Sequence, residues 1–384
     1  MSSIYLDHNA TTRVDPEVRR AMLRFLDEEF GNPSSIHAAG RAARDAIEQA
    51  RREVARLCGG RADEIVFTSG GTEGDNLAVR GAARAARAAD AGRTRIVSSP
   101  LEHPAVAGAL ASLASEGFVV TLLTVDAAGR IDPDELTRAL GDDVALVSLQ
   151  LANHELGNLY PIAELASRAR TCGAWFHTDA VQAAGKIPLE LATLGVDVAT
   201  ISAHKLHGPK GVGAIYLREG RRLSPHTVGG HQERERRPGT ENVPGVVGFG
   251  VAARLAVDGG LARSAEISSL RDRLEAGARA LGARVHGDLS SPASRVGNTI
   301  NLAWDGVEGE LLVENLDLEG IAASTGAACT SGSLEPSPVI LALGQARGRA
   351  REAVRFSLGR DNTAGEIDRV LGLLPSLLAR IRAA

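Results

Sequence analysis

Lysine, cysteine and aromatic residues are scarce in this chain of 384 residues, and each scarcity limits the core or the kinds of site that the protein can have. Aromatic residues make up only 3% of the sequence, so the core must consist mainly of Ala, Leu and Val. The three cysteines, Cys58, Cys172 and Cys329, are odd in number and widely spaced. That pattern excludes a disulfide framework and a paired-cysteine zinc site. We therefore expect no intrinsic metal, and any functional cysteine to act as a free thiol.

Targeting and membrane signals are also missing from the sequence. The first residues lack a basic region followed by a hydrophobic run, and no apolar stretch reaches membrane-spanning length. A formal net charge of −4 gives no reason to expect binding to nucleic acid or to a membrane surface. These absences predict a soluble, cytoplasmic protein.

The only lysines are Lys186, Lys205 and Lys210, so arginine supplies almost all of the positive charge. Lys205 follows the largely apolar, strand-like run 196–201 and precedes a turn rich in Gly and Pro. That is where an α/β protein presents an amine to a ligand. Lysine can form a Schiff base and arginine cannot, which makes Lys205 the first candidate for a catalytic amine.

Short β-branched runs alternate with stretches of helical apolar spacing through the first half of the chain. The predicted strands are 65–68, 95–98, 119–124, 144–150, 175–178 and 198–202, and the predicted helices are 75–89, 105–115, 132–140 and 162–172. Strict alternation predicts right-handed crossovers and a mainly parallel sheet, with ligand chemistry at the carboxyl ends of its strands.

The pattern changes from about Gly259. A helix over 267–280 is followed there by strand-like segments 284–286 and 298–303 and by further helices. We therefore predict an α/β protein with two domains. A large domain would span residues 14–258, and a smaller α/β domain would combine residues 1–13 with residues 259–384.

Polar residues follow several of the predicted strands. The turn Ser69-Gly-Gly-Thr72 opens a helix, whose free N–H groups suit a phosphate, although most such turns only start a helix. The imidazole of His103 could stack on an aromatic ring and move protons, or belong to an ordinary loop histidine. Asp179 could keep a pyridinium nitrogen protonated, or simply cap a helix.

Three further polar residues complete this pattern. Gln182 could donate to a phenolate oxygen, and Ser202 and His204 could add to the phosphate site beside Lys205. The strand ends thus carry phosphate donors, a stacking ring, a partner for a ring nitrogen and an amine. Pyridoxal phosphate requires this set of groups.

Ordered motifs over nearly the whole chain then establish a family resemblance. The motifs are Tyr5-Leu-Asp-His-Asn-Ala-Thr-Thr12, Gly31-Asn-Pro-Ser-Ser35, Thr68-Ser-Gly-Gly-Thr-Glu73, Glu102-His-Pro104, Asn153-His-Glu-Leu-Gly157, His177-Thr-Asp-Ala-Val-Gln182, Ser202-Ala-His-Lys205, Gly229-Gly-His-Gln-Glu233, Gly239-Thr-Glu-Asn242, Cys329-Thr-Ser-Gly-Ser-Leu-Glu-Pro336 and Arg355-Phe-Ser-Leu-Gly-Arg360. The sequence resembles cysteine desulfurases of the NifS/IscS type, which are pyridoxal-phosphate enzymes of the aminotransferase class V. The resemblance is greatest to the nitrogen-fixation branch.

The resemblance implies an aspartate-aminotransferase-like fold (fold type I) and pyridoxal 5'-phosphate bound to Lys205. The phosphate would be held by Gly71, Thr72, Ser202 and His204, with Thr240 reaching it from the partner subunit of a homodimer. Around the ring, His103 would stack on one face, Asp179 would bind the nitrogen, Gln182 would bind the phenolate oxygen, and Asn153 would lie beside both ring and substrate. Arg355 would clamp the substrate carboxylate, with Asn32 near it.

The resemblance also implies a role for Cys329, which lies in a run of small residues, 322–333. Its thiolate would attack Sγ of L-cysteine to give a persulfide and L-alanine, while Lys205 takes the Cα proton and His103 shuttles protons. The sulfur would pass to an iron–sulfur scaffold protein, so that Cys329 would transiently contact a cluster. Cys58 and Cys172, at predicted helix ends, are expected to be buried or half-buried hydrophobes.

Other activities stay open at this point. The same fold and lysine serve selenocysteine lyases and aminotransferases, and an aminotransferase needs no thiol. A non-enzymatic sulfur carrier that retains the fold is a further alternative. The sequence also departs from the family at His154, Gly74, Thr325 and Ala327, where Asn or Ser is usual. Whether the sulfur serves nitrogenase or general cluster assembly is not decided by the sequence.

Overall fold

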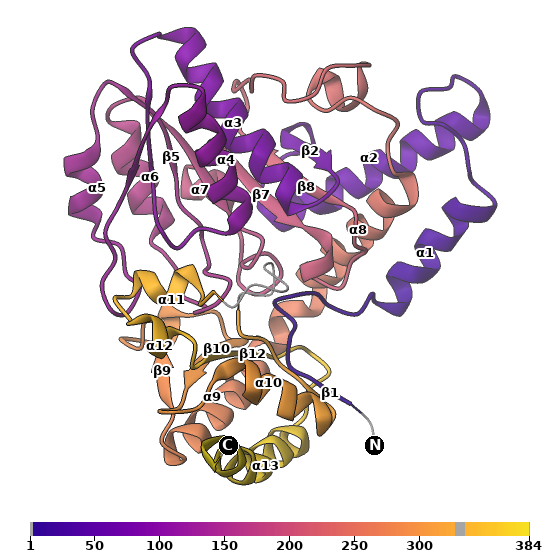
Figure 1. Cartoon of the computed structure of the whole chain (residues 1–384). Coiled ribbons are helices and arrows are strands. Elements are labelled where there is room, and N and C mark those ends of the chain that lie inside the picture. The colour runs from indigo at the N-terminus through magenta and orange to yellow at the C-terminus, as the bar shows by residue number, and fades with distance from the viewer. Residues whose placement is uncertain (1–2, 327–334, 384) are drawn as a thin grey trace.

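The computed structural model describes residues 3–326 and 335–383, which form two lobes (Figure 1). The larger lobe contains a seven-stranded sheet with the order β2-β8-β7-β6-β5-β3-β4. Its strands are β2 (Ile65–Thr68), β3 (Arg95–Ser98), β4 (Val119–Leu122), β5 (Val144–Ser148), β6 (Trp175–Asp179), β7 (Val198–Ser202) and β8 (Gly213–Leu217).

Helices cover both faces of this sheet. They are α1 (Pro16–Asp27), α2 (Ala38–Cys58), α3 (Gly71–Ala89), α4 (Pro104–Ser115), α5 (Pro133–Ala139), α6 (Ile162–Arg170), α7 (Leu191–Leu194) and α8 (Val243–Leu255). Side chains alternate between two cores, because successive residues of a strand point to opposite faces. Ile65 and Phe67 of β2 belong to the core that includes residues of α2, α6 and α8, whereas Val66 belongs to the core that includes residues of α3 and α4.

The predicted mainly parallel α/β sheet is confirmed, but strict alternation of strand and helix is wrong at β8. This strand follows β7 without an intervening α-helix and pairs antiparallel with both β7 and β2. The connection from Leu206 to Val212 contains a Gly-Pro turn and is too short for the crossover that a parallel neighbour requires. The other strands of the sheet run in one direction, so their carboxyl ends share one edge.

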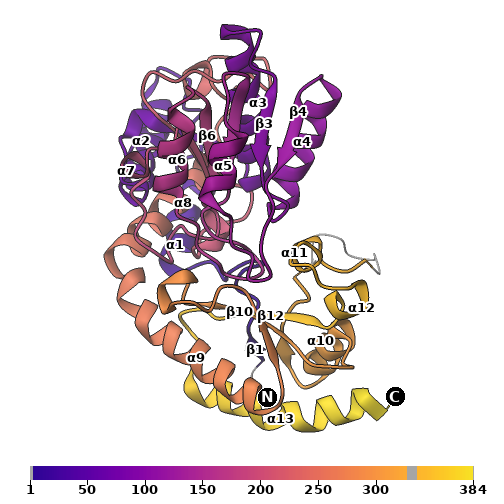
Figure 2. The same ribbon diagram turned by 90° about the vertical axis from the view of Figure 1, so that its left-hand side faces the viewer.

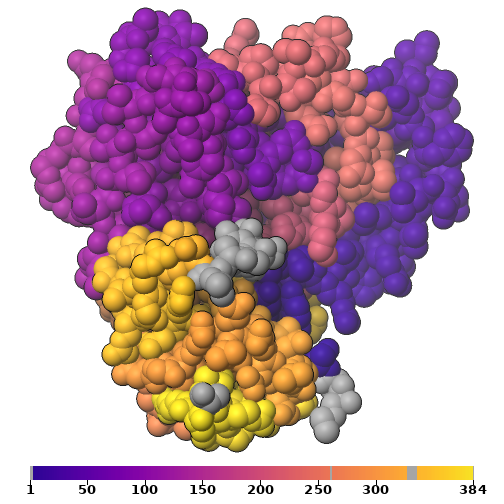
Figure 3. All heavy atoms as spheres, in the orientation of Figure 1, coloured from indigo at the N-terminus to yellow at the C-terminus, as the bar shows by residue number. Residues whose placement is uncertain are grey.

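The smaller lobe is built on an antiparallel sheet with the order β12-β10-β9. Its elements are β9 (Arg284–His286), β10 (Thr299–Ala303), β11 (Ile321–Ala322), β12 (Ala353–Ser357), α9 (Ser264–Ala280), α10 (Gly309–Leu318), α11 (Pro338–Ala342), α12 (Arg347–Ala350) and α13 (Ala364–Ala383). Helices α9 and α13 lie on the outer side of this lobe, away from the large sheet (Figure 2). In the space-filling view the orange and yellow residues form a separate mass beneath the rest of the chain (Figure 3).

The N-terminal segment packs on the smaller lobe, as expected. Strand β1 (Ile4–Tyr5) pairs in parallel with β11, and Ile4 and Leu6 belong to the small hydrophobic core. This core is distinct from the two that flank the large sheet. Many buried residues of 259–384 belong to this core, but Val339 and Ile340 of α11 belong to a core beside the large sheet, so the domain limits at residues 13/14 and 258/259 stay a proposal.

Helix α8 packs closely on α2 before the chain passes into the smaller lobe. A Cβ added to Gly250 would lie 2.5 Å from Ala50 Cα, so the close approach of the two helices requires glycine there. Among the described residues, no single helix is long and apolar enough to cross a membrane. Segments 243–259 and 264–280 meet that test of length and composition only as a pair bent by 82°.

Candidate active site

A cradle of hydrogen-bond donors lies where β2 and β7 end. The N-cap of α3 is Gly70, which has no side chain to bond the helix start, so the N–H groups of Gly71 and Thr72 remain for another acceptor. A Cβ added to Gly71 would lie 3.8 Å from Ser202 Cβ, so the start of α3 faces the end of β7. Ser202 Oγ is buried and has no partner among the described residues. These groups suit a phosphate.

Three buried carboxyls, Asp75, Glu102 and Asp179, lie at the same edge. Side-chain atoms of Asp75, His103 and Asp179 are all within 4.8 Å of one another. Burial, and then the charge of Asp75, raises the pKa of Asp179 to about 7. Burial raises the pKa of Asp75 to about 7 and that of Glu102 to about 8. Within the described ranges no Lys or Arg forms an ion pair with them, so a cationic group would be stabilised here.

His103 is the N-cap of α4, and its Nδ1 accepts a hydrogen bond from Ala105 N at 3.1 Å. This bond places the proton of the neutral imidazole on Nε2. Burial lowers the pKa of His103 below its ordinary value, although the carboxylate of Asp179 opposes the shift. His103 is therefore a neutral donor that can exchange a proton near neutral pH.

Asn153 is fully buried in the turn that follows β5. Its Oδ1 accepts from the N–H groups of Glu155 and Leu156, and its Nδ2 donates to Leu101 O at 3.1 Å. One N–H of Asn153 remains for the predicted contact with ring and substrate. The neighbouring His154 ring lies 5.3 Å from that of His103.

Lys205 ends the 3₁₀ turn Ala203–Lys205 that follows β7. Its Nζ donates to the backbone carbonyls of Asn9, at 2.5 Å, and Ala10, at 2.9 Å. His204 Nδ1 lies 3.2 Å from Thr11 Oγ1, and burial, with the charges of Lys205 and Lys210, lowers the pKa of His204 to about 4. The amine and a neutral imidazole therefore lie together at the sheet edge, against the N-terminal segment.

Gln182 contacts two residues that sequence reasoning did not place in the site. Its Nε2 donates to Asn9 O at 3.0 Å, and its Oε1 accepts from Lys186 Nζ at 2.5 Å. Two signals were available in the sequence. Asn9 lies inside a recognised motif, and Lys186 is one of only three lysines, four residues after Gln182.

Arg355 on β12 faces the same region from the smaller lobe. It is only 3% exposed, its Nη2 lies 2.8 Å from Asp7 Oδ1, and its Nη1 donates to His154 O at 3.0 Å. Its Nε is buried and has no partner among the described residues. A guanidinium with an open N–H in this position can bind a carboxylate.

Three predicted site residues do not join this cluster within the described chain. Thr240 is exposed and lines a separate cavity of about 160 Å³ with Ser69 and Arg237. Asn32 is exposed on the connection between α1 and α2, where its Oδ1 accepts from Ser34 N, and that connection lies apart from β12, the strand of Arg355 (Figure 1). Cys329 lies outside the described residues.

The other two cysteines behave as the sequence predicts. Cys58 is fully buried at the end of α2, and burial raises the pKa of its thiol to about 12. Cys172 is half-buried just after α6, with its Sγ 3.3 Å from Ala169 O. The buried Cys58 thiol therefore lacks the exposed surroundings of a nucleophile.

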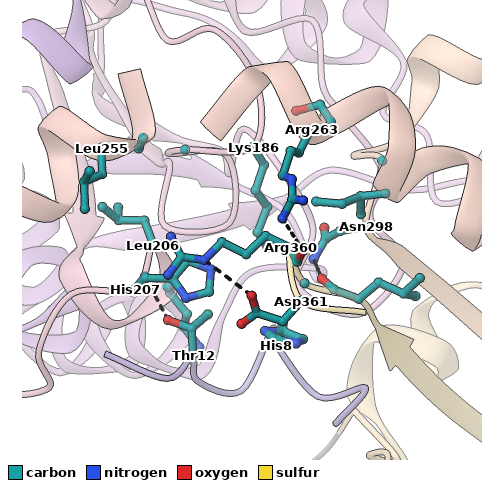
Figure 4. Close-up of a pocket in the computed structure, with 18 of the residues that line it drawn as sticks. His8, Thr12, Lys186, Leu206, His207, Leu255, Arg263, Asn298, Arg360 and Asp361 are labelled. Atoms are coloured by element: carbon teal, nitrogen blue, oxygen red, sulfur yellow. Dashed lines mark hydrogen bonds and ion pairs between the residues drawn. The ribbon is translucent and has the colours of Figure 1, made fainter. Parts of the chain in front are cut away.

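A cavity of about 450 Å³ lies between the lobes (Figure 4). Leu206 and Leu255 line it from the large lobe, and Asn298 and Arg360 line it from the smaller one. Of the predicted site residues, only Lys205 contributes to its wall. The cavity is thus separate from the carboxyl and phosphate groups at the sheet edge.

Comparison with known proteins identifies the family. Residues 4–370 match the family Aminotransferase class-V. The chain belongs to the class-V aminotransferases. Within that family, a cysteine desulfurase of Cereibacter sphaeroides is 50% identical, covering 100% of this chain and 97% of that protein. The cysteine desulfurase NifS of Azotobacter vinelandii is 47% identical, covering 100% of this chain and 94% of that protein.

Comparison with solved structures leads to the same family as these relatives. A NifS-like protein superposes with a TM-score of 0.91 at 36% identity, covering 98% of this chain and 99% of that one. The predicted aspartate-aminotransferase-like fold and the resemblance to cysteine desulfurases are therefore confirmed.

Proposed function

We propose that this class-V aminotransferase is a pyridoxal-phosphate-dependent cysteine desulfurase. It converts L-cysteine and the Cys329 thiol into L-alanine and a Cys329 persulfide, in which the substrate sulfur has moved to Cys329 Sγ. The observation that carries the proposal is the meeting of Lys205, Asp179 and the α3 N-terminus at one sheet edge. The names of the relatives support the choice of L-cysteine as substrate.

The donor set fits pyridoxal phosphate. The uncapped start of α3 and the unpartnered Ser202 Oγ match a phosphate dianion. The buried Asp179, which lacks a Lys or Arg partner among the described residues, matches a protonated ring nitrogen. Gly71, Thr72, Ser202 and His204 would hold the phosphate, and Asp179 and Gln182 would hold the ring.

The bound cofactor supplies an aldehyde that reacts with amines and a ring that accepts electrons from the substrate's Cα. The protein's own groups would then move protons. The Lys205 amine takes the proton from Cα, Asp179 holds a proton at the ring nitrogen, and His103 Nε2 exchanges protons with the substrate sulfur and amine.

Substrate binding adds Arg355 of the smaller lobe to the groups at the sheet edge. Arg355 would bind the carboxylate of L-cysteine as a planar fork, and Asn153 would use its remaining N–H beside it. The Cys329 thiolate would attack Sγ, breaking the Cβ–Sγ bond and keeping the sulfur as a persulfide. The product sulfur would pass to an iron–sulfur scaffold protein, with nitrogenase clusters as one destination.

A cytoplasmic homodimer would complete the site. Thr240 and Asn32 are both exposed and lie apart from Lys205 and Arg355 of their own chain, so each is available to a partner subunit. Phe30 and Ile36, on the same connection as Asn32, are 81% and 87% exposed. Apolar side chains this exposed are typical of an interface.

The proposal predicts a yellow protein that forms alanine from L-cysteine. Borohydride reduction should attach the cofactor to the peptide that contains Lys205, and Lys205→Ala should abolish that label. Cys329→Ser should keep the bound cofactor and the spectral response to L-cysteine but lose almost all alanine release. Cys172→Ser is the matched control and should turn over normally. If Cys329→Ser released alanine at the normal rate, the lyase alternative would replace the desulfurase.

A further inference from the structure

Lys186 is a half-buried lysine behind the proposed site that none of the steps above uses. It lies in the turns that follow β6, four residues after Gln182. Its Nζ donates to Gln182 Oε1 at 2.5 Å and to Asn9 Oδ1 at 2.8 Å. No carboxylate of the described residues forms an ion pair with Lys186, and burial, with the charges of Lys205 and Arg355, lowers the pKa of its amine well below the ordinary value. Its two neutral acceptors therefore explain its placement better than charge pairing does.

The contact with Lys186 decides how the Gln182 amide is oriented. Lys186 Nζ donates to Gln182 Oε1, so the amide oxygen of Gln182 faces Lys186. Gln182 Nε2 therefore points the other way and donates one N–H to Asn9 O at 3.0 Å. Its second N–H is left for the phenolate oxygen that Gln182 is proposed to bind.

Asn9 is held by the same lysine and connects both lobes. Its backbone carbonyl accepts from Lys205 and Gln182, so the two proposed cofactor residues share one acceptor. Its side chain joins Lys186 to the smaller lobe, because Oδ1 also accepts from Asn298 and Nδ2 donates to Thr299. A shift of Asn9 would therefore move the acceptor that aims the Lys205 amine.

We propose that Lys186 is a positioning residue of the desulfurase. The hydrogen bonds from its Nζ fix the Gln182 amide and the Asn9 side chain, and thereby orient the donor for the phenolate oxygen and the acceptor for Lys205. This inference rests on the proposed function, since it assumes that Gln182 and Lys205 face pyridoxal phosphate.

The cavity in Figure 4 offers a way to test, by chemical rescue, whether the donors of Lys186 act as proposed. Lys186 is one of its labelled residues and extends along its wall, and the volume is about 450 Å³. Removing the side chain beyond Cβ would leave room for a small cation that enters from the cavity. Ethylguanidinium carries the charge and the N–H donors and is a poor imine former, so it would not displace Lys205 from the cofactor.

The experiment uses the cofactor-loaded full chain and follows visible absorption as a function of pH. Losing the fixed Gln182 donor beside the phenolate oxygen favours the protonated form of the chromophore. We expect Lys186→Met to raise the pH midpoint by about one unit, a tenfold change in the proton affinity, and to weaken pyridoxal-phosphate binding about tenfold. Lys186→Arg should retain most of both properties.

Rescue and a matched control separate positioning from folding. Ethylguanidinium at millimolar concentration should return the midpoint of Lys186→Ala at least halfway to the native value, whereas NaCl at equal ionic strength should not. Lys210→Met, at an exposed lysine outside the cavity, should change neither midpoint nor affinity.

Two results would overturn the inference. One is a native midpoint and cofactor affinity in Lys186→Met, even with reduced thermal stability. The other is failure of ethylguanidinium to shift Lys186→Ala while Lys186→Arg behaves like Lys186→Met. Failure of the proposed function is distinguishable, because it would appear as missing alanine release from L-cysteine by the native protein, whereas the midpoint and the cofactor affinity of the Lys186 variants do not depend on turnover.

Discussion

The edge of the large sheet and the facing surface of the smaller lobe hold buried charge differently. At the sheet edge, Asp75 and Asp179 are buried without a Lys or Arg partner among the described residues, and their pKa values are raised to about 7. On the smaller lobe, the guanidinium of Arg355 is equally buried but already pairs with Asp7 at 2.8 Å.

This difference indicates which kind of ligand each region can bind. An unpaired buried carboxyl is costly, so its site becomes favourable only when a cationic partner arrives. A paired guanidinium is already stable, and a substrate carboxylate must share it with Asp7 or use the open Nε. The sheet edge is thus suited to a tightly held cofactor, and the smaller lobe to a substrate that binds and leaves.

The largest effect should come from removing the charge of Asp179. We expect Asp179→Asn to lower kcat/KM for alanine formation about 10²- to 10⁴-fold, because an amide cannot hold a proton at the ring nitrogen. Pyridoxal-phosphate affinity, followed by absorbance, should fall as well.

Asp75→Asn is the matched buried control for this change. It removes a charge that raises the pKa of Asp179, so it should favour the ionised Asp179 and keep most of the activity. Equal losses in Asp179→Asn and Asp75→Asn would contradict the assignment of Asp179 to the ring.

A smaller effect is expected on the substrate side. Arg355→Lys should raise the KM for L-cysteine about 10- to 100-fold with a lesser change in kcat, since an ammonium cannot replace a bidentate fork. Asp7→Asn should lower that KM, because the amide competes less for the guanidinium. Steady-state kinetics of alanine release measure both. An unchanged KM in Arg355→Lys would mean that another group binds the carboxylate.

The smallest effect concerns stability rather than turnover. Burial raises the pKa of Glu102 from 4.5 to about 8, so between these pH values the folded chain binds a proton that the unfolded chain has lost. The free energy of unfolding should therefore fall as the pH rises from 4.5 to 8. Glu102→Gln should reduce this dependence to the part that Asp75 and Asp179 contribute, and it should stabilise the cofactor-free protein by about 1–3 kcal/mol at pH 8.

Urea unfolding at pH 5 and pH 8 tests this expectation. The native protein and Glu102→Gln should differ little at pH 5, where Glu102 is protonated. A variant less stable than the native protein at pH 8 would show that the Glu102 carboxylate is stabilised at the sheet edge after all.

Local sequence determined much of the large lobe. The predicted strands 65–68, 95–98 and 198–202 match β2, β3 and β7 residue for residue. A buried strand needs only a short β-branched run between turn residues, and such a run is recognisable from the local sequence alone. The same local reading placed Lys205 directly after a strand and Cys58 at a buried helix end.

Tertiary structure alone decided which distant residues share the site. Arg355 and Asp7 pair across 348 residues, and Asn9 joins Gln182 and Lys205 from 173 and 196 residues away. The antiparallel placement of β8 also depended on its neighbours. Hydrophobic periodicity reports which face of an element is buried but not what it is buried against, so these contacts exist only once the chain has folded.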